Sequence, residues 1–433
     1  MKNKIIENLK IFFVINIIIL VSIFLGTCLL YLSYKIPHSN MEKNVYKSYQ
    51  VFEKEGDHPA VINQLKEQSR LDNFTDALML LNTITDSNIS TLKQCLLVYR
   101  YGDLYALPIN TLKKISNHEK VTEIVSYPRY WHGYLIVLKP LVSIFNYKQI
   151  RLINGLFQML IISFVILLFC KRKKYKLIIP YILLILVLMP PVIFKSLQYS
   201  TVWYIFNIGI LLLLLSSNKI NLSFKYVLYI FVILGAMTAY FDFYTYPIVT
   251  FGIPAIIYFS IFDSKNDNKI YKFFSICFSW AYTYFTVWVS KWIIGTIFTD
   301  ENVIRNALET AGGRISNIDS AGQKFTRMSA VSRNIDLFFN KYIVISLLIV
   351  LCIFIVISIK KYNLKNIKNI KSQWPLIIIG IMPFMWYYVF GNHSYIHYWM
   401  TNKGLCVTYF AIVMIMINSL TTAKKEDKHT IQE

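Results

Sequence analysis

Apolar residues gather into long runs along this chain, and short polar loops separate most of the runs. A transmembrane helix needs about 20 mostly apolar residues, and ten runs reach or approach that length. The pattern therefore predicts an all-α, polytopic membrane protein with about ten transmembrane helices. The predicted spans are residues 11–34, 150–170, 177–195, 201–217, 226–243, 245–262, 273–298, 342–359, 374–390 and 402–420.

Two segments outside these runs are long and polar, residues 35–149 and 299–341. In the first, apolar residues recur at helical spacing from Ala77 to Leu97, which predicts a helical extracytoplasmic loop that caps the membrane part. The stretch from Tyr134 to Phe145 is apolar but too short to span a bilayer, and Pro140 interrupts it. We expect a re-entrant or surface helix there.

The second polar segment carries two glycine-containing stretches, Ala311-Gly-Gly-Arg314 and Ser320-Ala-Gly-Gln323. Glycine permits sharp changes of backbone direction, so we interpret both as flexible turns and the segment as a mobile lid. The chain then divides into an N-terminal transmembrane anchor (1–34), an extracytoplasmic loop with juxtamembrane helices (35–149), a transmembrane core (150–298), a second extracytoplasmic loop (299–341), C-terminal transmembrane helices (342–420) and a cytoplasmic tail (421–433).

Lysine and arginine are concentrated in alternate loops. If the N-terminus is cytoplasmic, every internal loop is basic, beginning with Lys171 to Lys174, and the short external connections carry neither residue. Cytoplasmic loops of membrane proteins show this enrichment. We therefore predict a multi-pass protein of the cell membrane with both termini in the cytoplasm. The first run exceeds the apolar core of a signal peptide and no small-residue cleavage site follows it, which indicates a retained anchor.

Composition narrows the function classes. Only 16% of the 433 residues are charged, below the roughly 25% typical of soluble domains. A net charge of +22 would suggest nucleic-acid binding in a soluble protein, but here the basic residues lie in short loops rather than on one polar surface. Nucleic acid is therefore not an expected partner. The six cysteines form no metal-binding pattern, and the absence of a phosphate-binding loop excludes an ATP-driven pump.

The first candidate site is Arg70-Leu-Asp-Asn-Phe-Thr-Asp76, which places two carboxylates and a cation within one short stretch. Asp72 has the spacing of an N-cap for a helix that runs through Leu81. Asp76 would lie inside that helix, where no capping role explains it, so it leads Asp72 as the candidate catalytic base. Arg70 is a candidate substrate contact. The alternative is a solvated loop with an ordinary helix cap.

A second cluster, Tyr127-Pro-Arg-Tyr-Trp-His-Gly-Tyr134, surrounds Arg129 and His132 with aromatic rings. Arginine forks phosphate oxygens and rings stack on sugars, which favours a site for a lipid phosphate or a sugar. An interfacial aromatic belt is the alternative. Asp242 lies near the end of a predicted span, where an ionisable group is often functional, although a helix cap or an interfacial ion pair is equally consistent.

A third cluster runs from Asn392 to Lys403. His393 and His397 are four residues apart and would share one helical face. They form half of a metal site, a phosphate contact together with Lys403, or a pair of histidines at a wet interface. Arg314 in the second polar segment is a further candidate for contacting phosphate.

The whole arrangement resembles the GT-C type of integral-membrane glycosyltransferases: an N-terminal anchor, a large first external loop with an acidic residue, juxtamembrane helices and many further spans. The stretches Tyr-Trp-His-Gly-Tyr, Asp-Phe-Tyr-Thr-Tyr-Pro and Asn-His-Ser-Tyr-Ile-His also resemble those of uncharacterised membrane proteins of Gram-positive bacteria. The chain departs from the GT-C pattern because its first external loop lacks an Asp-x-Asp or an adjacent acidic pair.

The resemblance implies a polyprenyl-phosphate-linked sugar as donor, a glycan or lipid acceptor, and a first-loop carboxylate, Asp76 or Asp72, as general base or metal ligand. It leaves open whether a divalent cation takes part. Positive charge for the leaving phosphate would come from a set comprising Arg129, His132, Arg314, His393 and Lys403. The alternative functions are a polysaccharide polymerase or ligase, and a flippase or transporter of a lipid-linked glycan. A transporter would show inverted repeats and polar groups at mid-bilayer, and neither is evident.

Overall fold

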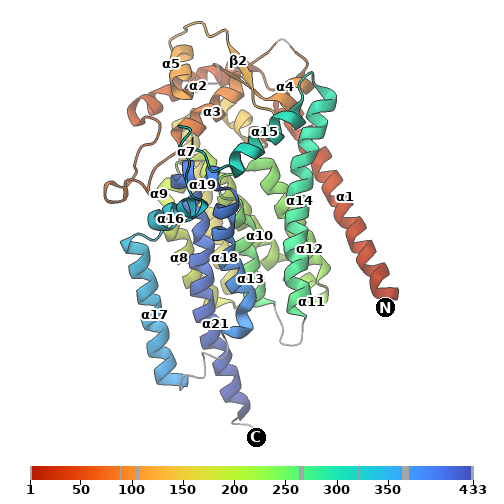
Figure 1. Cartoon of the computed structure of the whole chain (residues 1–433), viewed down its shortest axis with the longest axis vertical. Coiled ribbons are helices and arrows are strands. Elements are labelled where there is room, and N and C mark those ends of the chain that lie inside the picture. The colour runs from red at the N-terminus through yellow and green to blue at the C-terminus, as the bar shows by residue number, and fades with distance from the viewer. Residues whose placement is uncertain are drawn as a thin grey trace.

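The computed structural model describes residues 2–87, 89–102, 107–262, 268–319, 321–362 and 370–430. The chain is 78% helical with two three-residue strands, which confirms the all-α prediction. Long helices run side by side along the longest axis, and a layer of shorter helices, here called the cap, covers one end (Figure 1). The cap comprises α2 (His38–Glu55), η1 (Asn63–Leu65), α3 (Asn73–Ile84), α4 (Thr91–Leu97), β1 (Tyr99–Tyr101), α5 (Pro108–Ser116), β2 (Ile124–Ser126) and α6 (Leu135–Ile144).

The long helices form a bundle beneath the cap. At its centre lies α13 (Ile248–Ile261), which is buried along most of its length, as expected of a helix that is apolar on all sides. The other members of the bundle are α1 (Lys2–Ser33), α7 (Tyr147–Lys171), η2 (Tyr175–Leu177), α8 (Ile178–Val187), α9 (Pro190–Ile193), α10 (Leu197–Leu215), α11 (Ser217–Leu222), α12 (Lys225–Phe241), α14 (Lys269–Phe298), α17 (Lys341–Tyr362), η4 (Lys371–Gln373), α18 (Trp374–Val389) and α21 (Cys406–Thr430).

Short helices fill the space between the bundle and the cap (Figure 1). They come from the polar segment after α14 and from the connection between α18 and α21, so segments distant in sequence meet at this level. These helices are α15 (Val303–Ile315), α16 (Arg327–Phe338), α19 (Gly391–Ile396), α20 (Tyr398–Thr401) and η5 (Asn402–Leu405).

Within the described residues, five helices have the length and apolar composition needed to cross a membrane. They are Ile5–Ser33, Tyr147–Lys171, Leu197–Leu215, Lys341–Ile359 and Tyr398–Leu420, and each coincides with a predicted span. The other five predicted spans also fold into helices, but α8, α12, α13 and α18 are shorter and α14 is more polar. The run 177–195 breaks because Pro190 and Pro191 follow Met189, which has a left-handed φ of 56°.

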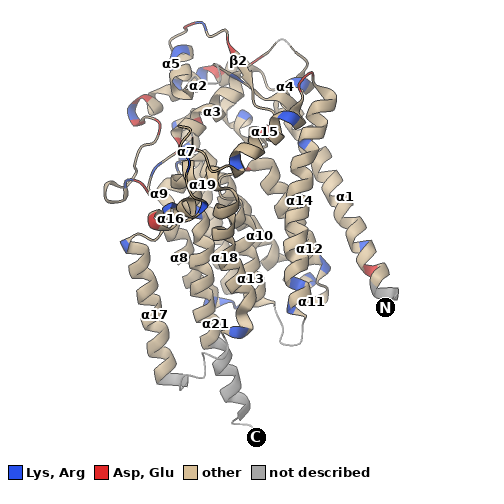
Figure 2. Ribbon diagram, viewed as in Figure 1, with Lys and Arg blue, Asp and Glu red and all other residues tan. Residues whose placement is uncertain are grey.

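The outer surface of the bundle has the character of a membrane protein. Large apolar side chains on α1, α7 and α17 point outward, for example Phe24 with an exposed fraction of 68% and Leu160 with 65%. Charged residues gather in the cap and at the opposite end, and they are sparse along the middle of the helices (Figure 2). An apolar band between two charged ends is the surface expected of helices that contact lipid.

The segment 127–134, predicted as a ligand-binding cluster, attaches the cap to the bundle. Trp131 stacks on Tyr240 of α12 with ring centroids 4.5 Å apart, and its indole N–H donates to the carbonyl of Val287 in α14 at 2.7 Å. The backbone N–H of Gly133 donates to the carbonyl of Tyr240 at 2.8 Å. A Cβ on Gly133 would lie 2.7 Å from that oxygen, so only glycine permits this approach.

The interpretation of residues 311–314 as a flexible turn is wrong, because Ala311 to Arg314 form the last turn of α15. Glycine lowers helix propensity by only about 1 kcal/mol, which packing readily offsets. The stretch from Ala321 to Gln323 does turn, with Gly322 at φ 79°, whereas Ser320 lies outside the described residues. The predicted tail, 421–433, continues α21 as far as Thr430, and residues 431–433 lie outside the description.

We expect the substitution Gly133→Ala to loosen the attachment of the cap. The added methyl group clashes with the Tyr240 carbonyl and displaces the hydrogen bond, which should cost about 1–3 kcal/mol of unfolding free energy. Thermal unfolding of the detergent-solubilised protein, followed by tryptophan fluorescence, measures the loss. Gly312→Ala is the matched control, because nothing lies within 4 Å of a Cβ there. Equal stability of the two variants would contradict the proposed attachment.

Candidate functional site

A cavity of about 320 Å³ lies where the cap, the short helices and the bundle meet. Four of the predicted site residues line it: Asp72, Arg314, His393 and His397. Aromatic rings form much of the remaining wall, and a few small or flexible side chains complete it. The other lining residues are His58, Phe74, Thr75, Leu78, Tyr127, Gln198, Phe243, Trp399 and Met400.

Asp72 caps α3 and also faces the cavity. Its carboxylate accepts from the Thr75 N–H at 3.1 Å and from the Thr75 hydroxyl at 2.8 Å, which confirms the predicted N-cap. The imidazole Nδ1 of His58 lies 3.8 Å from the same carboxylate, too far for a hydrogen bond. Burial raises the pKa of Asp72, although His58 and the bonds from Thr75 oppose the shift. A carboxylate with a raised pKa beside an imidazole is suited to accepting a proton.

Asp76 does not line the cavity. Its carboxylate caps α10 from a different element, accepting the backbone N–H groups of Leu197 at 3.0 Å and Gln198 at 3.1 Å. The hydroxyl of Tyr147 donates to it at 2.6 Å. Burial raises the pKa of Asp76 to about 6 despite these three donors. The argument that no capping role explains Asp76 is therefore wrong, because the helix that it caps is distant in sequence, and Asp72 becomes the stronger candidate for chemistry.

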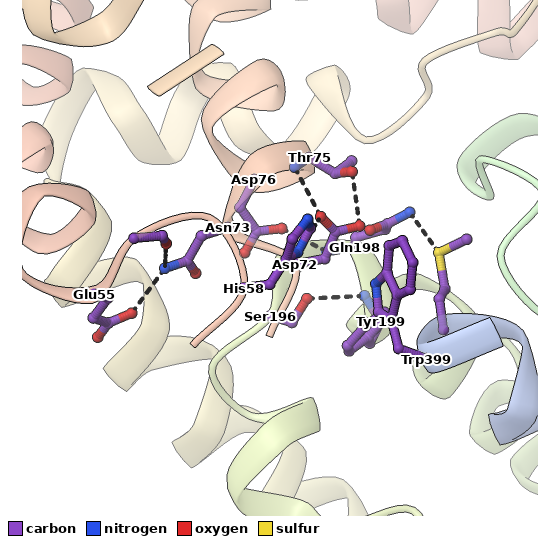
Figure 3. A network of polar contacts seen from close by, with 12 residues as sticks. Glu55, His58, Asp72, Asn73, Thr75, Asp76, Ser196, Gln198, Tyr199 and Trp399 are labelled. Carbon is purple, nitrogen blue, oxygen red and sulfur yellow. Dashed lines mark hydrogen bonds and ion pairs between the residues drawn. The ribbon is translucent and has the colours of Figure 1, made fainter. Parts of the chain in front are cut away.

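The two aspartates lie close to each other among several groups of polar contacts at the start of α3 (Figure 3). The side-chain amide of Asn73 donates to Glu55 at 3.1 Å and to the carbonyl of Gly56 at 2.8 Å. On the other side of α3, Asp72 and His58 approach Trp399, whose ring centroid lies 5.2 Å from that of His58. At the start of α3, Asn73 is therefore hydrogen-bonded to the end of α2, and the preceding residue, Asp72, faces the cavity.

Arg314 is the only lysine or arginine among the residues that line the cavity. It reaches the wall from the last turn of α15, and its Nη1 donates to Nε2 of His397 at 3.1 Å. Burial, together with the nearby charge of Arg314, lowers the pKa of His397 to about 3, so the imidazole is neutral at physiological pH. Arg314 therefore supplies a permanent positive charge, and its guanidinium group is oriented by the neutral imidazole of His397.

His393 presents an unbonded acceptor atom. Its Nε2 lies 2.7 Å from the carbonyl of Tyr244 and therefore carries the hydrogen, which leaves Nδ1 as an acceptor. That Nδ1 is buried and has no hydrogen-bond partner among the described residues. Oε1 of Gln198 and the indole N–H of Trp399 are likewise buried and have no hydrogen-bond partner among the described residues. Buried polar atoms without partners are uncommon, and here they line one cavity.

The remaining predicted site residues lie elsewhere, in bonded positions. His132 contacts the carbonyl of Tyr127 through Nε2 at 2.8 Å, and burial lowers its pKa to about 3, so it is neutral. Asp242 accepts the N–H and hydroxyl of Thr245, which closes the turn after α12. Neither residue lines the cavity; Asp242 is the residue at which α12 ends, and its side chain bonds to the turn that follows rather than to the start of a helix.

The last three predicted residues are cations, and each has its own partners. Arg70 pairs with Glu67 at 2.6 Å, and Nζ of Lys403 donates to the carbonyl of Trp399 at 2.8 Å. Arg129 lies 4.3 Å from the centre of the Tyr127 ring and lines a neighbouring pocket of about 40 Å³. That pocket also contains Arg314, together with the rings of Tyr130, Tyr244, Trp288, Trp292 and Phe390.

Gln198 and Trp399 are not among the predicted site residues, although they lie in the polar stretches 196–201 and 392–403, and no sequence pattern points to His58. His58 stands before Pro59, a signal of a turn, and nothing local connects it with Asp72, which lies on the next element.

Among the described residues, no group of three or more His, Cys, Asp or Glu side chains is arranged to hold a metal ion. The chain matches no protein-family model, and no curated protein or solved structure is similar to it.

We expect Asp76→Asn to destabilise the protein. An amide presents a donor to N–H groups that need an acceptor, and such an unsatisfied buried contact costs about 1–3 kcal/mol. Thermal unfolding in detergent measures the effect, with Asp336→Asn as the control because Asp336 is exposed on α16. Unchanged stability together with lost activity would instead assign Asp76 to the chemistry.

Proposed function

We propose that this protein is an integral-membrane glycosyltransferase that moves a sugar from a polyprenyl-phosphate donor to a hydroxyl group of a cell-envelope glycan or lipid. The observation that carries the proposal is the pairing of a buried carboxylate, Asp72, with a fixed cation, Arg314, on the walls of one aromatic-lined cavity. The cavity lies at the cap end of apolar helices, where an amphiphilic donor has its charged group. A flippase would instead carry its polar groups deep within the bundle.

The proposed topology has ten membrane-crossing segments with both termini in the cytoplasm and the cap outside. In support, α12, α13, α14 and α18 pack directly against the long apolar helices, and the helices lie side by side in Figure 1. Basic residues such as Lys171 lie at the end of the bundle opposite the cap, as the positive-inside rule requires of the cytoplasmic side. Lys265, Lys365 and Lys368, which belong to two further loops predicted on this side, lie outside the described part of the chain.

In the proposed reaction, the carboxylate of Asp72 accepts the proton of the acceptor hydroxyl as its oxygen attacks the anomeric carbon. The bond between that carbon and the donor phosphate oxygen breaks, and the polyprenyl phosphate leaves with the electron pair. Arg314 stabilises the negative charge that develops on the phosphate. One base and one leaving-group clamp suffice for this inverting transfer, and holding the reactants together supplies much of the acceleration.

The residues that line the cavity and the neighbouring pocket support separate binding places for the sugar and for the phosphate of the donor. Aromatic faces such as those of Trp399 and Phe243 suit a sugar ring, and the buried acceptors of His393 and Gln198 suit its hydroxyl groups. Arg129 and Arg314 line the second pocket, which suits a phosphate group bound from two sides. Arg314 belongs to both pockets, so it stands where the sugar and the phosphate would be joined.

We expect Asp72→Asn and Arg314→Gln to abolish sugar transfer. Loss of a general base typically costs 10²–10⁴-fold, and loss of a charge that stabilises the leaving group costs about 10²-fold or more. The assay uses purified protein in proteoliposomes with a panel of radiolabelled polyprenyl-phosphate hexoses, and it measures release of the free polyprenyl phosphate.

Asp336→Asn is the control for Asp72→Asn, because it makes the same chemical change on an exposed surface of the same end of the molecule. It should retain the parental rate. If Asp72→Asn folds normally and retains that rate too, the proposed chemistry is wrong. If the parent consumes no donor in the panel, the donor class is wrong.

The topology makes a separate prediction about accessibility in intact cells. A cysteine replacing Lys113 on α5 should react with a membrane-impermeant maleimide, whereas a cysteine replacing Lys171 at the end of α7 should react only after lysis. Both lysines are exposed, and Cys95, the native cysteine of the cap, is buried. The opposite labelling pattern would place the cap in the cytoplasm and remove the proposed access to an external donor.

A further inference from the structure

A second concave surface lies on the far side of α3 from the cavity, along α2 and the first turns of α7. It is a groove of about 610 Å³ that shares none of the residues lining the cavity. Three lysines, one arginine and one glutamate stand among its lining residues, and the others are mostly apolar. The lining residues are Gln50, Val51, Lys54, Glu55, Lys148, Arg151, Leu152, Gly155, Leu156, Met159, Phe194 and Lys195.

The charges of the groove do not cancel. Arg151 is buried and neutralises Glu55, with Nη1 at 2.9 and 2.8 Å from its two carboxylate oxygens. Lys54, Lys148 and Lys195 are exposed, and none of them forms an ion pair with a described residue. Three uncompensated cations therefore surround one opening, although like charges repel and are disfavoured at close range.

The groove continues from these cations onto an apolar helix face. Leu152, Leu156 and Met159 follow one another at helical spacing on α7, with exposed fractions of 64%, 54% and 55%. Since α7 is one of the five helices long and apolar enough to cross a membrane, this exposed apolar face is suited to contact lipid. A cationic rim directly above an apolar helix face matches a molecule with an anionic head and apolar tails.

Loop orientation does not explain the three lysines. The positive-inside bias accounts for basic residues at one end of the bundle only, and the connection at Lys171 to Lys174 already lies at the end opposite the cap. Lys54, Lys148 and Lys195 lie at the cap end and come from three separate segments, so this bias does not account for their meeting at one groove. Their position together on one groove therefore calls for a ligand.

We propose that this groove binds an anionic phospholipid, with the phosphate among Lys54, Lys148 and Lys195 and an acyl chain along Leu152, Leu156 and Met159. The lipid bridges α2 and α7, because the three lysines come from the end of α2, the first turn of α7 and the residue before the Ser196 cap of α10. The site is independent of the sugar-transfer proposal, and its test requires no catalytic assay.

The test measures lipid retention by native mass spectrometry of the full chain in detergent. The parent should retain dioleoyl-phosphatidylglycerol in preference to dioleoyl-phosphatidylcholine. The triple variant K54Q/K148Q/K195Q should bind phosphatidylglycerol at least about tenfold more weakly, since each lysine near an anionic lipid contributes on the order of 1 kcal/mol. Phosphatidylglycerol should also raise the unfolding temperature of the parent and not that of the variant.

The control variant K113Q/K114Q/K120Q removes the same charge from exposed positions elsewhere on the cap. It should retain phosphatidylglycerol as the parent does. Equal weakening in both triple variants would show a general electrostatic effect and overturn the site. Equal retention of the two lipids by the parent, or displacement of phosphatidylglycerol by an equal concentration of inorganic phosphate, would overturn it as well.

Discussion

The carboxylate of Asp76 joins the cap to the membrane helices, and the position of the candidate site depends on that contact. It stands on α3 in the cap, yet its oxygens accept the first N–H groups of α10 and the hydroxyl of Tyr147 on α7. A buried charge is tolerated only when donors surround it, so the three elements are held in one arrangement. Asp72 lies one helical turn earlier on α3, and the same contact therefore fixes it at the cavity wall.

Two buried lysines make contacts of the opposite polarity, one across this junction and one within the cap. Lys139 on α6 donates to the carbonyl of Thr83 in the last turn of α3, and Lys291 on α14 donates to the carbonyl of Leu96 in the last turn of α4. The carbonyl ends of helices lack internal partners and carry partial negative charge. A carboxylate thus satisfies the start of a bundle helix, and ammonium groups satisfy the ends of cap helices. The contacts of Asp76 and Lys291 hold only in one relative placement of cap and bundle, whereas the contact of Lys139 joins two helices within the cap.

Local patterns were enough to predict the features that depend on neighbouring residues. The apolar runs predicted an all-α chain, and the spacing after Asp72 predicted its N-cap, because both follow from a single helix. The proximity of His393 and His397 is a consequence of the same periodicity, with ring centroids 4.9 Å apart. The contact between His58 and Asp72 and the cap that Asp76 provides join separate elements. No spacing in the sequence encodes either of them.

The number of membrane spans also could not be predicted from local sequence patterns alone. Run length alone does not separate α14, whose tyrosines, tryptophans and Lys291 serve packing and helix capping, from an apolar span that faces lipid. Pro190 and Pro191 likewise divide a run that composition treats as continuous. Five helices meet the length and composition of a span, and the proposal of ten depends on how the shorter helices lie beside them, which is a tertiary property.

The groove and the cavity are linked through the first residues of α3. Arg151 on the groove floor donates to the side-chain oxygen of Asn73 at 2.7 Å, and Asn73 directly follows Asp72. Asn73 also donates to Glu55, which holds the end of α2 against the same arginine. A phosphate bound among the groove lysines would reinforce this arrangement by neutralising the surplus charge around Arg151. Lipid on one side of α3 would then steady the carboxylate on the other, and the two surfaces would act through one short helix start.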